Sequence, residues 1–355
     1  MKSRTKKILN FALIFGTLAL VLLVGINGQE MTGALDALKA IAPVWIVLCV
    51  GAYLLHLCLD ASTIWHYLRC QGYKVSFRYA LFNSIIGMYY SNVTPGATGG
   101  QPMQVYYLKK KGVPIGIGTS ALTVKFFCFQ FMLAVLSTVL WIAYGDYIAV
   151  QTGSSIWILI VGYTYNLITV SFVLMMAVNK NLVRFFIKLF IRIGTKLHIC
   201  KNPEATLVKW EDILSTFHES VMSMRTHPKD FFIQLVLGGA ILLAQMLPIF
   251  LVYCAFELTG SNYLELTTLG IMLYVSAAYT PLPGASGAQE GVFAIYFSKV
   301  FPDRIRLMAL LLWRFFTYYI SILVGAVTTV VDGFRKHKSL EAEATKEEAS
   351  PEEEA

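Results

Sequence analysis

The chain has 355 residues, of which 56% are hydrophobic and 14% are charged, and its mean hydropathy is +0.61. Because a soluble domain carries about 25% charged residues, this composition excludes a water-soluble enzyme and predicts an integral membrane protein. The net charge of +8 is unevenly spread, since residues 341–355 hold seven of the 21 acidic residues and one basic residue.

Six apolar runs are long enough to cross about 30 Å of hydrocarbon as helices. They are residues 8–27, 41–64, 117–143, 155–178, 231–257 and 306–331. No clear small-residue cleavage site follows the first run, so we interpret it as a membrane anchor rather than a signal peptide.

Two further apolar stretches, residues 79–108 and 265–299, are each broken midway by a cluster of prolines and glycines. A helix that breaks inside hydrocarbon leaves backbone polar groups without partners, so a break survives only where protein or a wet cavity covers it. We therefore expect each stretch to form a re-entrant hairpin, which enters and leaves on one side; the alternative is a fully spanning segment. The expected fold class is an all-α membrane protein with about six spanning helices and two such hairpins.

The lysines and arginines set the expected orientation. With the N-terminus in the cytoplasm and both hairpins re-entrant, 22 basic residues fall on the cytoplasmic side and four fall outside. A single crossing by either broken stretch would exchange the sides of the later basic residues, which favours hairpins. We expect a multi-pass protein of the cytoplasmic membrane with both termini in the cytoplasm.

The longest predicted cytoplasmic piece is residues 180–229. Its first basic residues recur every four positions from Lys180 to Lys196, with apolar residues between them, a pattern typical of a helix lying on an anionic leaflet. We interpret this piece as an amphipathic elbow that joins two halves, with a regulatory site as the alternative. Residues 1–335 form the expected membrane domain, and residues 336–355 an acidic, disordered cytoplasmic tail.

An internal repeat relates the two broken stretches. Pro95-Gly-Ala-Thr-Gly-Gly-Gln101 aligns with Pro283-Gly-Ala-Ser-Gly-Ala-Gln289 at an offset of 188, with five of seven residues identical. Pro114 and Pro302 keep this offset, and Lys125-Phe-Phe matches Arg314-Phe-Phe one residue later. The repeat predicts a duplicated unit rather than two unrelated helix breaks.

The predicted topology gives the two repeat units opposite directions. Residues 41–143 form the first half and residues 231–332 the second, so the halves make an inverted-topology repeat. Interrupted segments at matching positions of such a repeat point to a substrate site near the middle of the membrane and to alternating access.

Two cations, Lys125 and Arg314, fall inside predicted spans, where a central charge costs about 2.5–3.5 kcal/mol on insertion scales. Their matched positions favour a functional role. Glu290 follows the second turn and can pair with either cation or contact a cationic headgroup. With two cations and one carboxylate, we expect a net positive cavity that selects an anionic headgroup.

The candidate substrate-binding residues are the turn residues, whose glycines allow close backbone approach, and these charged groups. They are Asn92, Thr94, Pro95, Gly96, Gly99, Gly100, Gln101, Lys125, Pro283, Gly284, Gly287, Gln289, Glu290 and Arg314. Asp60, Glu257 and Asp332 are expected near membrane interfaces. No catalytic residue, metal-ligand spacing, cofactor site or ATP motif is expected from the sequence.

Asn92-x-Thr-Pro-Gly-x-x-Gly-Gly-x-Pro102 and Pro281-Leu-Pro-Gly-x-x-Gly-x-Gln-Glu-Gly291 resemble the flippase-like transmembrane domain of the lysylphosphatidylglycerol synthase (multiple peptide resistance factor) family. The similarity covers roughly residues 5–335. It implies a bacterial membrane protein that moves lipids such as aminoacylated phosphatidylglycerol between leaflets. Full-length members add a cytoplasmic acyltransferase-like domain that uses lysyl-tRNA, whereas about twenty polar residues follow Asp332 here.

The function expected from these features is lipid translocation of an anionic or aminoacylated phospholipid, such as lysylphosphatidylglycerol. The expected partners are that phospholipid, a separate lipid synthase and a second copy of the chain, with no nucleic acid and no cofactor. One alternative is a phosphatidylglycerol lysyltransferase that acts with a partner synthase. The other is a non-transporting membrane scaffold.

Overall fold

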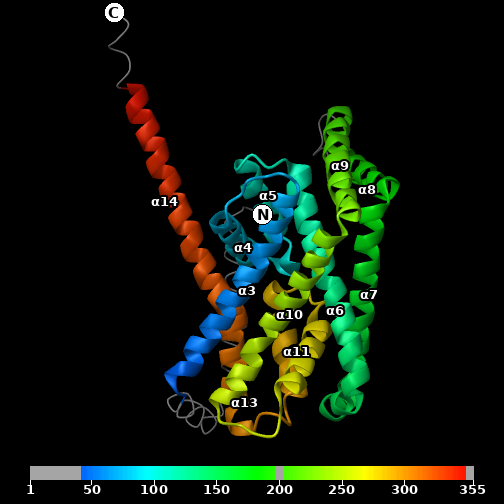
Figure 1. The fold of residues 1–355 in the computed structure, drawn as a ribbon, viewed down its shortest axis with the longest axis vertical. Coiled ribbons are helices and arrows are strands. Elements are labelled where there is room, and N and C mark those ends of the chain that lie inside the picture. Colours follow the sequence, from blue (N-terminus) through cyan, green and yellow to red (C-terminus); the bar gives the residue numbers. More distant parts are fainter. Residues whose placement is uncertain (1–40, 197–202, 349–355) are drawn as a thin grey trace, which may run out of the picture.

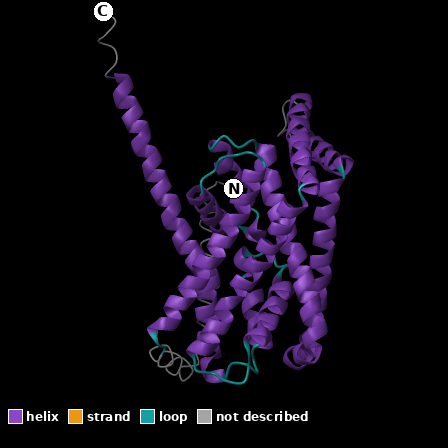
Figure 2. Cartoon of the chain, viewed as in Figure 1, coloured by secondary structure: helices purple, strands orange, loops and turns teal. Residues whose placement is uncertain are grey.

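The protein is described by a computed structural model over residues 41–196 and 203–348. These residues form helices joined by loops, with no strand among them (Figure 2). The predicted first span, residues 8–27, lies outside the described residues. The all-helical class predicted from the sequence is therefore confirmed for this part of the chain.

The helices run in chain order as follows. They are α3 (Pro43–Cys70), α4 (Phe77–Asn92), η1 (Pro95–Ala97), α5 (Gly100–Lys110), α6 (Ile115–Thr152), η2 (Gly153–Ser155), α7 (Ile156–Val178), α8 (Lys180–Lys196), α9 (Pro203–Thr226), α10 (Pro228–Ala255), α11 (Tyr263–Ala277), η3 (Pro283–Ala285), α12 (Ala288–Tyr296), α13 (Asp303–Arg314), the π-helical turn η4 (Phe315–Tyr319) and α14 (Ile320–Glu348).

Four helical stretches of the described chain are long and apolar enough to cross a membrane. They are Pro43–Cys70, Ile115–Met175, Pro228–Ala255 and Asp303–Phe334. The second stretch comprises α6 and α7, which reverse direction at Gly153 (φ +52°) and lie side by side (Figure 1). It thus covers two of the predicted spans, 117–143 and 155–178, and the total of six spans stays a prediction.

Helices α3 and α10 form the centre of the bundle. Each has 28 residues and begins with proline at its first turn, where the missing N–H costs no helical hydrogen bond. They pack along each other, and α10 also contacts α6 and α11. The approach to α6 is close, because a Cβ on Gly238 would stand 3.0 Å from the backbone of Cys128.

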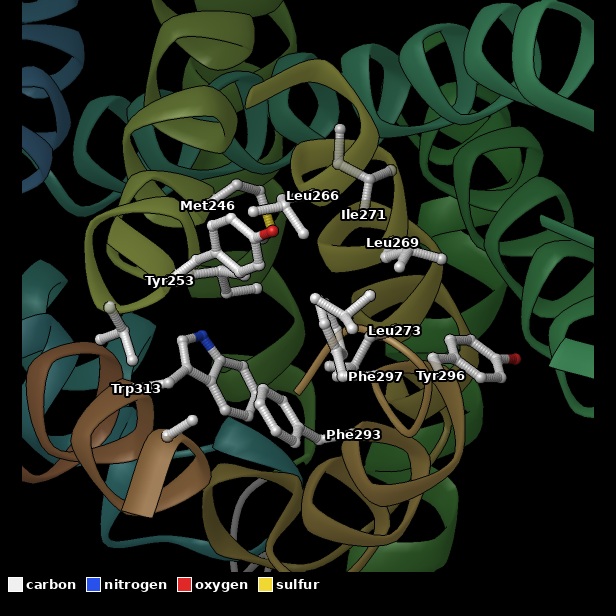
Figure 3. Close-up of a cluster of buried hydrophobic side chains, with 14 of the residues drawn as sticks. Met246, Tyr253, Leu266, Leu269, Ile271, Leu273, Phe293, Tyr296, Phe297 and Trp313 are labelled. Carbon is white, nitrogen blue, oxygen red and sulfur yellow. The ribbon is translucent and has the colours of Figure 1, made fainter. Parts of the chain in front are cut away.

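The largest apolar cluster holds the second half of the chain together (Figure 3). Within it the ring of Phe293 on α12 stacks on Trp313 of α13, with ring centroids 5.2 Å apart, and on Phe297 at 4.6 Å. Stacked buried rings contribute about 0.5–1.5 kcal/mol per pair beyond area burial. This packing fixes α12 against α13 and so positions Arg314, the residue after Trp313.

Helices α4 and α5, with the η1 turn, form an antiparallel pair that we call the first hairpin (residues 77–110). Asn83 and Gln104 bind each other's backbone reciprocally: Asn83 Nδ2 donates to the Gln104 oxygen at 3.0 Å, and Gln104 Nε2 to the Asn83 oxygen at 3.2 Å. At Gly100 the helices are too close for a side chain, since a Cβ would stand 2.0 Å from Ser91 Oγ.

Helices α11 and α12, with the η3 turn, form the second hairpin (residues 263–296). It begins with a capping box, in which the Asn262 side chain accepts from the Glu265 N–H and Glu265 accepts from the Asn262 N–H. The hydroxyls of Ser276, at the end of α11, and Tyr296, at the end of α12, lie 2.8 Å apart and join the two helices.

The two hairpin turns have the same backbone conformation. Gly96 has φ/ψ of 58°/25° and Gly284 has 59°/21°, and the following alanines, Ala97 and Ala285, also have positive φ. The turns contact each other, α6 packs on α11 of the second hairpin, and α14 packs on α4 of the first. The last helix of each half therefore contacts the hairpin of the other half.

The cytoplasmic elbow predicted at 180–229 contains two helices, α8 and α9. Arg184 on α8 forms an ion pair with Glu211 on α9, with Nε and Oε1 3.2 Å apart. Helix α9 packs on α6, where a Cβ on Gly116 would stand 2.6 Å from Thr216 Cβ. The segment is thus joined to the helical bundle.

One prediction about the C-terminal tail is wrong. Residues 336–348, which we expected to be disordered, continue α14 as a helix (Figure 1). The stretch is rich in glutamate and lysine and also contains alanine, and these residues have high intrinsic helix propensity. Because α14 is already helical before residue 336, extending it into the tail carries no nucleation cost. The polar composition of the tail therefore does not end the helix.

Candidate functional site

Arg314 ends α13 and turns into the second hairpin. Its side chain is 4% exposed, and its Nε lies 2.6 Å from Glu290 Oε1. Nη1 donates to Gln289 Oε1 at 2.6 Å, while Nη2 donates to the Gly284 oxygen at 3.1 Å and to Ser286 Oγ at 3.3 Å. The planar guanidinium, with donors on three nitrogens, thus holds both sides of one turn.

Aromatic rings complete the enclosure of Arg314. The guanidinium carbon lies 4.5 Å from the ring centroid of Tyr318 and 5.7 Å from that of Trp313. Tyr318 also donates a hydrogen bond from its hydroxyl to the Asn92 oxygen, at 3.1 Å, in the other hairpin. A Cβ on Gly284 would stand 2.0 Å from the Tyr318 ring, so this position requires glycine for space as well as for its positive φ.

Glu290 has a second partner in the same turn. Its Oε2 accepts a hydrogen bond from the Gly287 N–H at 2.6 Å. The equivalent N–H in the first hairpin, that of Gly99, donates instead to Thr94 Oγ1 at 2.9 Å. Both turns therefore satisfy the same backbone donor, by a carboxylate in one half and by a hydroxyl in the other.

Lys125 on α6 is paired with Asp60 on α3. Its Nζ lies 2.6 Å from Asp60 Oδ1 and 2.7 Å from Oδ2, and the two side chains are 18% and 10% exposed. We expected Asp60 at a membrane interface, but the structure buries it against a cation 65 residues away. The expectation of a net positive cavity is also wrong, because each intramembrane cation has its own carboxylate.

The two cations differ in how firmly they are held. Arg314 is fixed by four side-chain or backbone acceptors of the second hairpin. In the described chain, the structure gives Lys125 one counter-ion, Asp60, on a different helix. Lys125 is therefore the cation whose ammonium can change partners without unfolding a turn.

Two adjoining cavities lie between the hairpins, one beside each cation. The larger has a volume of about 570 Å³ and includes Arg314, and the smaller, of about 280 Å³, includes Lys125. Seven residues line both cavities: Ser91, Asn92, Phe126, Gln130, Gln245, Tyr274 and Thr317. The shared wall is mostly polar and comes from both halves of the chain.

The larger cavity reaches the surface between α7 and the segment that precedes η3. Tyr165 on α7 is 44% exposed and Tyr279 is 39% exposed, their rings meet edge to face with centroids 6.5 Å apart, and both line the cavity. Helix α7 carries many other exposed apolar side chains. Exposed apolar surface of this kind is typical of a side that contacts lipid or another protein.

The structure brings part of the predicted site together. Seven of the predicted residues line the cavities: Asn92, Gly96, Gly284, Gln289 and Arg314 in the larger, and Asn92, Gln101 and Lys125 in the smaller. The others lie outside both linings and shape or hold the turns: Thr94, Pro95, Gly99, Gly100, Pro283, Gly287 and Glu290.

Four residues of the site were not predicted from the sequence: Asp60, Tyr318, Gln130 and Gln245. Asp60 carried a usable signal, because it is a carboxylate inside the apolar stretch that forms α3. Gln130 and Gln245 are polar but uncharged residues within long apolar helices, which is a weaker indication of a functional role. Tyr318 had no local signal, because its role arises from contacts with Arg314 and with the opposite hairpin.

The fold also brings together three residues that can bind metals. Ligand atoms of His66, Cys70 and Asp230 lie within 4.8 Å of one another where α3 meets α10. His66 Nε2 is 3.5 Å from Asp230 Oδ1, and His66 Nδ1 is 3.2 Å from Gln234 Nε2. Both ring nitrogens therefore have protein partners, and the cluster is satisfied as a polar junction between the two central helices.

The long apolar helices and the buried charges beside the cavities define a multi-pass helical membrane protein. The sequence profile described as "Lysylphosphatidylglycerol synthase TM region" matches residues 8–325, and the chain belongs to this family. It is also similar to a "UPF0104 membrane protein" of Archaeoglobus fulgidus, with 22% identity over 257 residues, which cover 72% of this chain and 77% of that protein. The predicted family resemblance is confirmed.

Proposed function

We propose that the protein is a lipid translocase that moves an anionic or aminoacylated phospholipid, such as lysylphosphatidylglycerol, between leaflets of the cell membrane. The observation that carries this proposal is the pair of adjoining cavities between two matching hairpin turns, each cavity beside one buried cation. A phospholipid headgroup is polar and its chains are apolar. The larger cavity suits such a molecule because polar and apolar residues both line it, and we place a lateral opening beside the exposed Tyr165 and Tyr279.

The hairpins are proposed to be re-entrant. Their helices have 16, 11, 15 and 9 residues, each fewer than the roughly 20 residues that a crossing helix needs. Non-helical backbone at membrane depth must be covered by protein or water, and the η1 and η3 turns contact each other beside the cavities.

The halves are proposed to form an inverted-topology repeat. The supporting observations are the equal turn torsions, the equal φ/ψ of −54°/146° at Pro114 and Pro302, and the exchanged packing of α6 and α14 on the opposite hairpins. Inverted repeats allow one site to open alternately to each side by rocking of the halves. The same architecture would expose the headgroup site to one leaflet at a time.

The proposed orientation puts α8, α9 and the C-terminal end of α14 in the cytoplasm. These elements lie toward the same end of the molecule in Figure 1, opposite the start of α13. Helix α5, which lies toward that end in Figure 1, has Lys109 and Lys110 in its last turn and is followed by Lys111. Basic residues are enriched on the cytoplasmic side of membrane proteins, which supports this orientation.

Reconstitution tests the proposal. Purified protein in vesicles should accelerate transfer of fluorescent phosphatidylglycerol between leaflets, measured by dithionite quenching of the outer leaflet. Lys125→Gln should slow the transfer at least tenfold, and Lys74→Gln, which changes an exposed loop lysine, should behave as wild type. Transfer no faster than in protein-free vesicles contradicts the proposal.

A second measurement separates translocation from synthesis. In cells with and without the gene, outer-leaflet amines are labelled with a membrane-impermeant reagent before lipid mass spectrometry. Translocation predicts a changed labelled fraction of an aminoacylated lipid and an unchanged total. Loss of the total amount would instead support a phosphatidylglycerol lysyltransferase acting with a partner synthase, and unchanged amount and distribution would support a scaffold.

A further inference from the structure

The smaller cavity has its charge set by a single ion pair. The described residues that line it include the titratable groups His56, Asp60, Lys125 and Tyr274. Lining residues from α4, α5, α10 and α14 are uncharged. His56 lies one turn before Asp60 on α3, and its Nδ1 is 3.3 Å from the Ile241 oxygen of α10, so the ring has a backbone partner.

Net charge in such a cavity is costly. Low-dielectric surroundings disfavour an unpaired ion strongly, whereas a neutral pair is tolerated. With Lys125 protonated and Asp60 ionised, the pair has no net charge. If a monoanionic headgroup enters and nothing else changes, the cavity carries one negative charge.

We propose that the Lys125–Asp60 pair couples movement of a phosphodiester headgroup to uptake of a proton. Asp60 takes the proton and becomes a neutral carboxylic acid, while Lys125 stays protonated and exchanges the Asp60 carboxylate for the phosphate. The site is then neutral both before and after loading. This inference rests on the proposed function and assigns its energy coupling.

The lining of the cavity supports this exchange. Uncharged polar side chains line the same cavity as the pair and supply hydrogen-bonding groups for a headgroup. They include Ser91, Asn92, Gln101, Gln130, Gln245 and Ser321. The cavity, of about 280 Å³ and lined by both polar and apolar residues, also has room for the waters that would deliver the proton.

The Arg314–Glu290 pair is not suited to the same exchange. Glu290 accepts a hydrogen bond from the Gly287 N–H in addition to its ion pair with Arg314. Arg314 in turn donates to the Gln289 side chain and to the Gly284 oxygen. Separating these groups would dismantle the η3 turn. Lys125 and Asp60 lie on separate helices, α6 and α3, so a small movement between the helices is enough to separate them.

Proton uptake on binding is the direct test. Full-length protein in detergent and weak buffer is titrated with dihexanoyl phosphatidylglycerol, with binding measured by calorimetry and protons by a pH indicator. About one proton should be taken up per bound lipid, and affinity should fall about tenfold for each unit of rising pH while Asp60 is ionised before binding. Wild-type binding without proton uptake overturns the proposal.

Matched variants locate the proton. Asp60→Asn should bind the lipid without proton uptake, whereas Asp303→Asn, which changes a carboxylate 82% exposed at the start of α13, should take up as many protons as wild type. Uptake that persists in Asp60→Asn but is lost in His56→Gln overturns the assignment. If Asp60→Asn aggregates on size exclusion, the number of protons that the wild type takes up per bound lipid decides whether the proposal stands.

Two further experiments separate the proposed proton coupling from the proposed lipid translocation on which it rests. Inorganic phosphate in place of the lipid should cause less than a tenth of the proton uptake, and equal uptake with phosphate alone overturns the assignment to a lipid headgroup. In vesicles, a pH gradient should drive net lipid movement. Lipid movement that ignores the gradient contradicts the coupling alone, and no movement at all contradicts the translocase.

Discussion

Tyr318 joins the two hairpins: its ring lies against Arg314 of the second half, and its hydroxyl donates to the backbone oxygen of Asn92 in the first, at 3.1 Å. The bond lies beside the cavities that both halves line. A rocking motion of the halves would have to stretch or break this contact, so it is a direct probe of the proposed motion.

Tyr318→Phe removes that hydrogen bond and keeps the ring over Arg314. We expect a loss of about 1 kcal/mol of stability and a change in the rate of lipid transfer in vesicles. The neighbouring variant Tyr319→Phe is the control, because no hydrogen bond between the hairpins depends on its hydroxyl. An unfolding midpoint and transfer rate identical to wild type in Tyr318→Phe would contradict a role in joining the hairpins.

The two turn glycines make a matched pair of variants. Gly96 and Gly284 have nearly equal positive φ, so alanine at either position incurs the left-handed penalty of about 1–2 kcal/mol. A Cβ on Gly284 would also stand 2.0 Å from the Tyr318 ring, whereas on Gly96 the nearest atom is 3.8 Å away. Gly284→Ala should therefore lower the unfolding midpoint clearly more than Gly96→Ala. Equal shifts would show that the Tyr318 ring moves freely.

The repeat, the hairpin breaks and the turn glycines were predictable because each is a local property of the sequence. Helix α3 begins at a proline, and the Pro-Gly-Ala turns repeat with the same torsions. The seven-residue motif adopts the same turn conformation at both of its positions in the chain. These features needed no knowledge of the tertiary structure.

The pairing of charges was not predictable in this way. Asp60 and Lys125 are 65 residues apart on different helices, and their distance depends on how α3 packs on α6. Glu290 was expected to pair with either cation, and the packing of α12 on α13 decides for Arg314. The sequence alone leaves the partners of these ion pairs undetermined, and the packing of the helices determines them.

Removing only the Arg314 charge from the Arg314–Glu290 ion pair should destabilise the protein more than removing both charges. Arg314→Gln leaves Glu290 buried without its cation, and removing one partner of a buried ion pair typically costs about 3–5 kcal/mol. The double variant Arg314→Gln with Glu290→Gln removes the uncompensated charge. We expect it to unfold at a higher temperature than Arg314→Gln alone, as measured by tryptophan fluorescence in detergent. Additive losses in the double-mutant cycle would mean that the two side chains act independently.

Close packing of α7 on α11 gives a last prediction, on the helix that borders the proposed lateral opening. A Cβ on Gly162 would stand 2.2 Å from the Val275 backbone oxygen, and backbone cannot rotate away as a side chain can. Gly162→Ala should therefore push α7 outward and destabilise the protein. Gly51→Ala on α3 is the control: nothing lies within 4 Å of its Cβ, and alanine should gain up to about 1 kcal/mol of helix propensity. If Gly162→Ala raises the unfolding midpoint as Gly51→Ala does, close packing of α7 on α11 is contradicted.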